Sequence, residues 1–195
     1  MKKLLISLIC LLTLCVANVH ADEIELPEVT DHEKVTIYIF RGNGCGFCKK
    51  ALTYFNENAS KYSDYLEVKT YEVYNNSANS TLMNAVGQHF GDDTGGVPYI
   101  VVGSTYHDSG FTDALGEEMV KAALTEYQNK DYKDVVSEIA EEHSSAKITT
   151  LYDACVEDGI IVVERDKSND AWIVLAIFAV IIGGGVGLIA LSRKK

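Results

Sequence analysis

The sequence predicts an α/β domain, in which helices flank a buried central sheet. Segments with strand-like patterns alternate with segments whose apolar residues recur every three or four positions, as they do on one face of a helix. The first strand-like segment, residues 35–40, is a continuous run of apolar, β-branched and aromatic residues, which is typical of a strand buried on both faces. A third observation is the pair Cys45 and Cys48, which stands where this strand is followed by a helical pattern.

Residues 35–128 supply the elements of this domain in order. A helix of about three turns is expected from Cys48, and residues 67–74 alternate like a second strand. Ser80 is the expected N-cap of a second helix, which Gly91 ends. The remaining expected elements are a strand after Pro98, a return strand at residues 106–110 and a closing helix at residues 116–128.

Beyond residue 129 the patterns are shorter. Residues 132–142 form an amphipathic helical pattern, residues 148–155 fit either a helix or a strand, and residues 160–163 are a short strand-like run. We therefore expect the main domain at residues 35–129, an irregular lead-in at residues 22–34, and a C-terminal extension and stalk at residues 130–170.

The Cys45-Gly46-Phe47-Cys48 motif carries the clearest chemical signal. If a helix begins near Cys45, its sulfur lies among unpaired N–H groups at the positive end of the helix dipole, which stabilises a thiolate. The thiolate is the attacking species in disulfide exchange, and Cys48, one turn further, is placed to resolve a mixed disulfide. The alternatives are a static disulfide or half of a zinc site. Zinc needs about four ligands, and the sequence has no second C-x-x-C or H-x-x-x-H motif, so redox chemistry is the favoured interpretation.

A proline at the head of an apolar strand is the second informative feature. Pro98 follows Gly95-Gly96-Val97 and precedes the apolar residues 99–102. Proline removes a donor from the sheet ladder and is normally confined to sheet edges, bulges or strand starts. Something other than strand pairing must require it here, and a cis Val97–Pro98 peptide bond is the expected reason.

This order of elements, with C-x-x-C at a helix start and Val-Pro before a later strand, resembles the thioredoxin fold over residues 35–128. The resemblance implies a central mixed sheet flanked by helices, a cis Pro98 packed against the active-site cysteines, and thiol-disulfide oxidoreductase activity on protein cysteines. It also implies that Cys45 is the nucleophile, Cys48 the resolving thiol, and Val97 a backbone partner for an extended substrate segment. No cofactor is expected beyond a redox partner, and no metal.

Three positions depart from the thioredoxin pattern. Gly44 stands where thioredoxins usually have a tryptophan, and Ile39 stands where they have a buried aspartate. The dipeptide Gly46-Phe47 is closer to those of bacterial periplasmic oxidases, isomerases and glutaredoxin-like proteins. The direction of electron flow, as oxidase, isomerase or reductase, therefore stays open. A further alternative is a non-catalytic binding or accessory module for export of a secreted peptide or protein, in which the thiols are incidental.

Both ends of the chain predict membrane targeting. Residues 1–21 resemble a signal peptide, with a basic start, an apolar middle and small residues before the expected cleavage at Asp22. Residues 171–191 carry no charge and, at about 31 Å as a helix, match a hydrocarbon core of about 30 Å. The basic residues 192–195 then belong in the cytoplasm by the positive-inside rule. We therefore expect a single-pass type I protein of the cell membrane whose domain faces outside, in a bacterium rather than in the lumen of the endoplasmic reticulum.

The segment between these ends is strongly acidic. Five of the 17 Lys and Arg residues lie in the two ends, so the remaining segment carries 12 of them against all 28 Asp and Glu, a net charge of −16. This charge argues against nucleic acid and against anionic lipid headgroups as partners. Protein thiols and disulfides are the substrates that the resemblance to thioredoxins implies. Gly183 and Gly187 form a G-x-x-x-G in the membrane segment, which lets two helices approach closely, so a homodimer is a further hypothesis.

Two other residues have two interpretations each. Arg41 either adds positive potential beside the Cys45 thiolate or is a solvated surface residue. Cys155 is the third cysteine outside the signal peptide, and we interpret it as a small buried hydrophobe, with a third redox thiol as the alternative.

Overall fold

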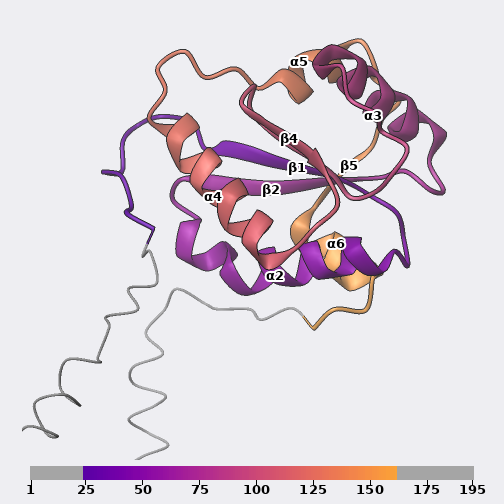
Figure 1. Ribbon diagram of the computed structural model, residues 1–195, viewed down its shortest axis with the longest axis horizontal. Helices are drawn as coiled ribbons and strands as arrows, with labels where there is room; N and C mark the ends of the chain where they lie inside the picture. The colour runs from indigo at the N-terminus through magenta and orange to yellow at the C-terminus, as the bar shows by residue number, and fades with distance from the viewer. Residues whose placement is uncertain (1–23, 162–195) are drawn as a thin grey trace, which may run out of the picture. The chain divides into compact units, whose positions relative to one another are not determined.

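Five strands form one mixed sheet. They are β1 (Val35–Arg41), β2 (Leu66–Glu72), β3 (Tyr99–Val102), β4 (Tyr106–Ser109) and β5 (Ile148–Thr150), and they lie in the order β4-β3-β1-β2-β5 (Figure 1). The computed structural model describes residues 24–161. β1 pairs in parallel with β2, whereas the β1–β3, β3–β4 and β2–β5 pairs are antiparallel. The expected α/β fold with a central mixed sheet is therefore confirmed for this part of the chain, and it is consistent with a thioredoxin-like fold.

Helices cover both faces of this sheet. In the described residues they are α2 (Gly46–Tyr62), α3 (Ser77–Phe90), α4 (Asp113–Tyr127), α5 (Val135–Glu141) and α6 (Leu151–Glu157). Side chains on a strand alternate between the two faces of its sheet. On β1, Tyr38 and Phe40 join the core that packs under α3 and α5, so Ile37 and Ile39 face the other layer, α2, α4 and α6. Figure 1 shows the same division, with α3 and α5 on one side of the sheet and α2 and α6 on the other.

The central strand β1 is the most protected element. All seven of its residues are buried, as the continuous apolar run predicts for residues 35–40. Phe40 lies between Tyr71 and Tyr99, with ring centroids 5.2 and 6.0 Å away, so aromatic stacking fixes the end of β1 on the α3 side. The C-x-x-C motif therefore follows a strand that is buried on both faces.

Two helices differ from the sequence prediction. α2 has 17 residues rather than about three turns, because Asn58 does not end it: its Nδ2 donates to the Tyr54 carbonyl at 2.8 Å within the helix. α3 begins earlier than expected. Its N-cap is Asn76, whose side chain accepts from the N–H groups of Ala78 and Asn79, so the prediction of Ser80 as N-cap is wrong. The predicted end at Gly91 is confirmed, with a left-handed φ of 77°.

The C-terminal extension adds to the same sheet. Residues 148–155, which fitted either a helix or a strand, contain both: β5 pairs with β2, and α6 follows it directly and packs on α2. Asn79 fastens this return, because its Nδ2 donates to the carbonyls of Glu72 and Lys147 and its Oδ1 accepts from the Lys147 N–H. Residues 160 and 161 form no strand, and residues 162 and 163 lie outside the described part.

The predicted membrane elements also lie outside the described part. They are the signal peptide at residues 1–21 and the membrane segment at residues 171–191. Within residues 24–161, no helix is both long and apolar enough to cross a bilayer. Residues 24–32, which belong to a separate unit from the one that begins at Glu33, contain no helix or strand.

Candidate functional site

The first cysteine of the motif caps helix α2. Cys45 is the N-cap residue, with φ −71° and ψ 123°, and its Sγ accepts from the Cys48 N–H at 3.2 Å. Gly44 makes the preceding turn with φ 76°, a conformation that favours glycine, and the Cys45 N–H donates to the Gly42 carbonyl at 3.1 Å. The half-buried Cys45 sulfur therefore lies at the positive end of the helix, as the sequence predicts.

The second cysteine is in a different environment. Cys48 is fully buried, and its Sγ accepts from the Gly42 N–H at 3.4 Å. Burial raises the pKa of Cys48 to about 12, and the hydrogen bond to Cys45 and the charge of Asp158 act in the same direction. Cys48 is therefore a neutral thiol at neutral pH. All three described cysteines are free thiols in this structure.

The predicted proline site lies against the same sulfur. The Val97–Pro98 peptide bond is cis, as expected. The Cys45 thiol donates to the Val97 carbonyl at 3.6 Å, and the Pro98 carbonyl accepts from the Gly110 N–H at 2.7 Å. The structure therefore brings together Cys45, Cys48 and the Val97–Pro98 peptide, although Val97 lies 52 positions after Cys45 in the sequence.

Arg41 is not a surface residue, so that interpretation is corrected. Its side chain is fully buried, because position 41 continues the face of β1 that carries Ile37 and Ile39. The guanidinium makes ion pairs with Glu157 and, at 3.2 Å, with Asp158, both at the end of α6. Its Nε donates to the Thr70 hydroxyl at 3.2 Å. We refer to Arg41, Thr70, Glu157 and Asp158 as the Arg41 cluster.

The Arg41 cluster also contacts the motif loop. One carboxylate oxygen of Asp158 accepts from the Gly44 N–H at 3.1 Å, while the other oxygen pairs with Arg41. The side chain of Asp158 is 4 % exposed and that of Glu157 is 46 % exposed, so the two acids differ although they share one arginine. Sequence reasoning missed Asp158, because it lies 114 residues from Gly44. The alternation of side chains along β1 is the one signal in the sequence that could have placed Arg41 on the same face as Ile37 and Ile39.

Two exposed aromatic residues lie beside the motif. Phe47, inside the motif, is 56 % exposed, and the Lys50 ammonium lies 5.4 Å from its ring centroid. Tyr74 is 61 % exposed, and its ring covers Gly42 so closely that a Cβ there would lie 2.3 Å from it. Large exposed aromatic side chains are typical of surfaces that bind other proteins.

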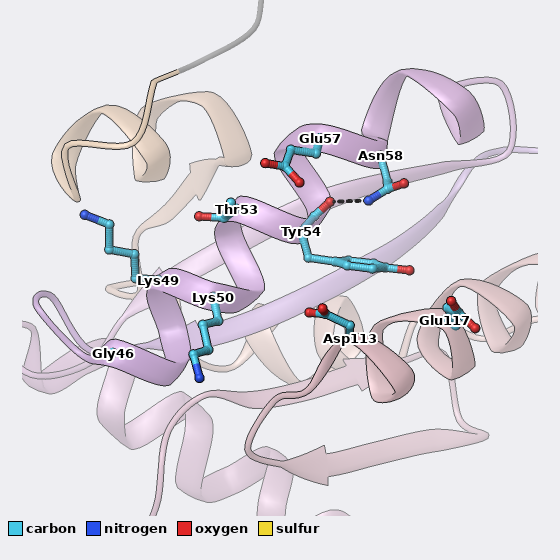
Figure 2. A pocket seen from close by; sticks show the side chains of 9 residues that line it. All are labelled: Gly46, Lys49, Lys50, Thr53, Tyr54, Glu57, Asn58, Asp113 and Glu117. Atoms are coloured by element: carbon cyan, nitrogen blue, oxygen red, sulfur yellow. Dashed lines mark hydrogen bonds between the residues drawn. The ribbon is translucent and has the colours of Figure 1, made fainter.

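A polar groove of about 620 Å³ begins at Gly46 and runs between α2 and α4. Figure 2 shows the ring of Tyr54 reaching from α2 toward Asp113 and Glu117 on α4, with Lys50 near the motif end. Polar and charged side chains make up most of this lining, whereas sites for small molecules and cofactors are mostly apolar. Within residues 24–161, no three His, Cys, Asp or Glu side chains are grouped as metal ligands would be.

Cys155 is buried completely in α6, and its thiol approaches the Leu52 carbonyl at 3.9 Å. Burial raises its pKa to about 11, so it is a neutral thiol at neutral pH. This environment agrees with the small buried hydrophobe expected from the sequence.

Comparison of the chain with known protein families and with curated proteins finds no match.

Proposed function

We propose that this protein is a thiol-disulfide oxidoreductase that acts on protein cysteines through a thioredoxin-like domain. The observation that carries this proposal is the asymmetry of the two thiols at the start of α2. Cys45 is accessible and sits at the helix N-terminus, whereas Cys48 is buried and neutral. Disulfide exchange needs this division, because one thiol must attack and the other must wait until a mixed disulfide has formed.

The exchange then runs in two displacements. The Cys45 thiolate attacks one sulfur of a substrate disulfide; the substrate S–S bond breaks, and the leaving thiolate takes up a proton. Cys48 next loses its proton and attacks the Cys45 sulfur; the mixed disulfide bond breaks, and the second substrate thiolate leaves and takes up a proton from solvent. The substrate gains two electrons and two protons, and Cys45 and Cys48 become a disulfide. Oxidation of a substrate is the same sequence in reverse, and both directions need a redox partner to restore the pair.

The surroundings of Cys45 favour a polypeptide substrate. The Val97 backbone lies next to the sulfur, where an extended segment can add its own hydrogen bonds. Phe47 and Tyr74 offer apolar contacts on the exposed rim. With the predicted signal peptide at residues 1–21 and membrane helix at residues 171–191, this domain would act outside the cell membrane on proteins that have been exported.

Cysteine replacements in the full-length protein test the proposal. Cys45→Ser keeps an oxygen acceptor for the Cys48 N–H, so α2 stays capped, and loss of activity then reports chemistry rather than unfolding. We expect Cys45→Ser to abolish reduction of a disulfide-bonded protein substrate, Cys48→Ser to accumulate a mixed disulfide through Cys45, and Cys155→Ser to stay active. Full activity of Cys45→Ser would sink the proposal and leave the non-catalytic accessory module in its place.

A further inference from the structure

In the described part of the C-terminal extension, the Asp158 side chain is hydrogen-bonded to the motif loop. Asp158 follows α6, more than 100 positions after the motif, yet it holds the Gly44 N–H with one oxygen and Arg41 with the other. Gly44 is the residue before Cys45, and Arg41 ends the buried strand that leads to the motif. This hydrogen bond and this ion pair therefore connect the motif loop to the end of α6 and to the end of β1.

Burial of the Arg41–Asp158 ion pair is energetically unfavourable. Taking charges out of water costs several kcal/mol per ion, so replacement of a buried ion pair by apolar residues is often neutral or stabilising. Stability alone therefore gives no reason for a carboxylate and a guanidinium at this position. What an apolar pair could not supply is a hydrogen-bond acceptor for the Gly44 N–H and a fixed charge beside the thiols.

The charged groups around the thiols lie on β1, β2, α2 and α6. β1 contributes Arg41, and α6 contributes Glu157, Asp158 and the neutral Cys155, while the neighbouring Thr70 of β2 has no charge. Within the Arg41 cluster, one positive and two negative groups leave an excess of one negative charge. The motif loop also meets the Glu72 carboxylate at the end of β2, which accepts from the Asn43 N–H at 3.2 Å, and the exposed Lys49 and Lys50 follow Cys48 on α2. Of the two carboxylates in the Arg41 cluster, Asp158 is the buried one, so its charge is the less screened by water.

We propose that Asp158 is a positioning residue for the Cys45–Cys48 pair: it fixes the motif loop through the Gly44 N–H and destabilises the reduced pair relative to the disulfide. This inference rests on the proposed function. A disulfide is neutral, whereas the reduced pair carries a negative charge whenever a thiolate forms. A fixed carboxylate beside the pair therefore opposes the reduced, thiolate-containing form. The C-terminal extension is thus part of the redox site rather than a spacer.

The test is the dithiol–disulfide equilibrium of the full-length protein in glutathione buffers. Asp158→Asn keeps an oxygen for the Gly44 N–H and removes the charge. We expect it to shift the equilibrium about tenfold toward the dithiol, which is a reduction potential about 30 mV less negative. Glu157→Gln is the matched control, because it takes one carboxylate from the same Arg41 without touching the loop, and we expect less than about a threefold shift.

The measured potentials distinguish a redox role of Asp158 from a contact that only supports the fold. A potential of Asp158→Asn equal to that of the wild type, or to that of Glu157→Gln, would overturn the inference and leave the Arg41 cluster as a fold contact. A wild-type pair that does not titrate reversibly would overturn the proposed function itself, and the inference with it. Asp158→Ala, which removes both oxygens, should shift the potential further, and Asp158→Asn carries the test even where Asp158→Ala does not fold.

Discussion

Tyr74 is the residue whose exposure most needs a functional reason. Tyr74 is 61 % exposed, and its ring covers Gly42, whose N–H donates a hydrogen bond to the Cys48 sulfur. An exposed tyrosine that packs on the motif loop is placed to contact a protein bound at Cys45. The fold gains little from it, because most of the ring remains in water.

We therefore expect Tyr74→Ala to lower kcat/KM for a disulfide-bonded protein substrate about five- to tenfold, since an aromatic contact at an interface contributes about 1 kcal/mol or more. Turnover of a small disulfide should hardly change, and the free energy of unfolding should stay within about 0.5 kcal/mol of the wild type. Tyr152→Ala is the control, because Tyr152 is a tyrosine of similar exposure, 52 %, on α6. Within the described residues, it makes no hydrogen bond or ring contact to the motif loop. Equal effects of the two substitutions on kcat/KM would contradict a specific role for Tyr74.

At the scale of single elements, helix α3 shows how local hydrogen bonds decide a boundary. Ser80 is a good N-cap residue, and the apolar stripe of the helix begins shortly after it. Asn76 nevertheless caps the helix, because its side chain accepts two backbone N–H groups while the Ser80 N–H already donates to the Asn76 carbonyl. Asn76 and Ser80 are both residue types that cap helices. The sequence alone does not show which backbone N–H groups each side chain would reach.

The two residues can be compared directly. Asn76→Ala leaves the N–H groups of Ala78 and Asn79 without their acceptor, so we expect it to lower the free energy of unfolding by about 1 kcal/mol. Ser80→Ala places a better helix former inside the helix and should change it by less than about 0.5 kcal/mol. Urea denaturation followed by circular dichroism measures both. A larger loss for Ser80→Ala than for Asn76→Ala would move the helix start back to the predicted position.

Elements that repeat a local pattern were predictable, and elements made by distant contacts were not. The apolar run of β1, the cysteine pair at the start of α2 and the cis bond before Pro98 all follow from the types of neighbouring residues. By contrast, β5 has three residues and pairs with β2 only because the chain returns after α5. The same return brings Asp158 to Gly44, so the acidic member of the site could not be found from spacing in the sequence.

For the whole molecule, buried groups with raised pKa values link stability to pH. Burial raises the pKa of Cys48 to about 12 and that of Cys155 to about 11, while an unfolded cysteine has a pKa of about 8.5. Burial also raises the pKa values of Tyr54, Tyr106 and Tyr132 to about 12, from an ordinary value of about 10. In each case the folded state keeps a proton that the unfolded state gives up.

The sign of the effect follows from this difference in bound protons. Below about pH 8.5 both states hold the thiol protons, and the stabilisation is fully present. Above that pH the folded state binds more protons than the unfolded state, so the free energy of unfolding of the reduced protein should fall, by up to about 1.4 kcal/mol per pH unit for each group. Urea denaturation in reductant between about pH 8 and about pH 10.5 measures the slope. Cys155→Ala should give a shallower slope, because one of the two buried thiols is then absent. The disulfide form should also give a shallower slope, since Cys48 no longer titrates in it. A free energy of unfolding that rises across this pH range would instead show that these thiols are not buried as the structure places them.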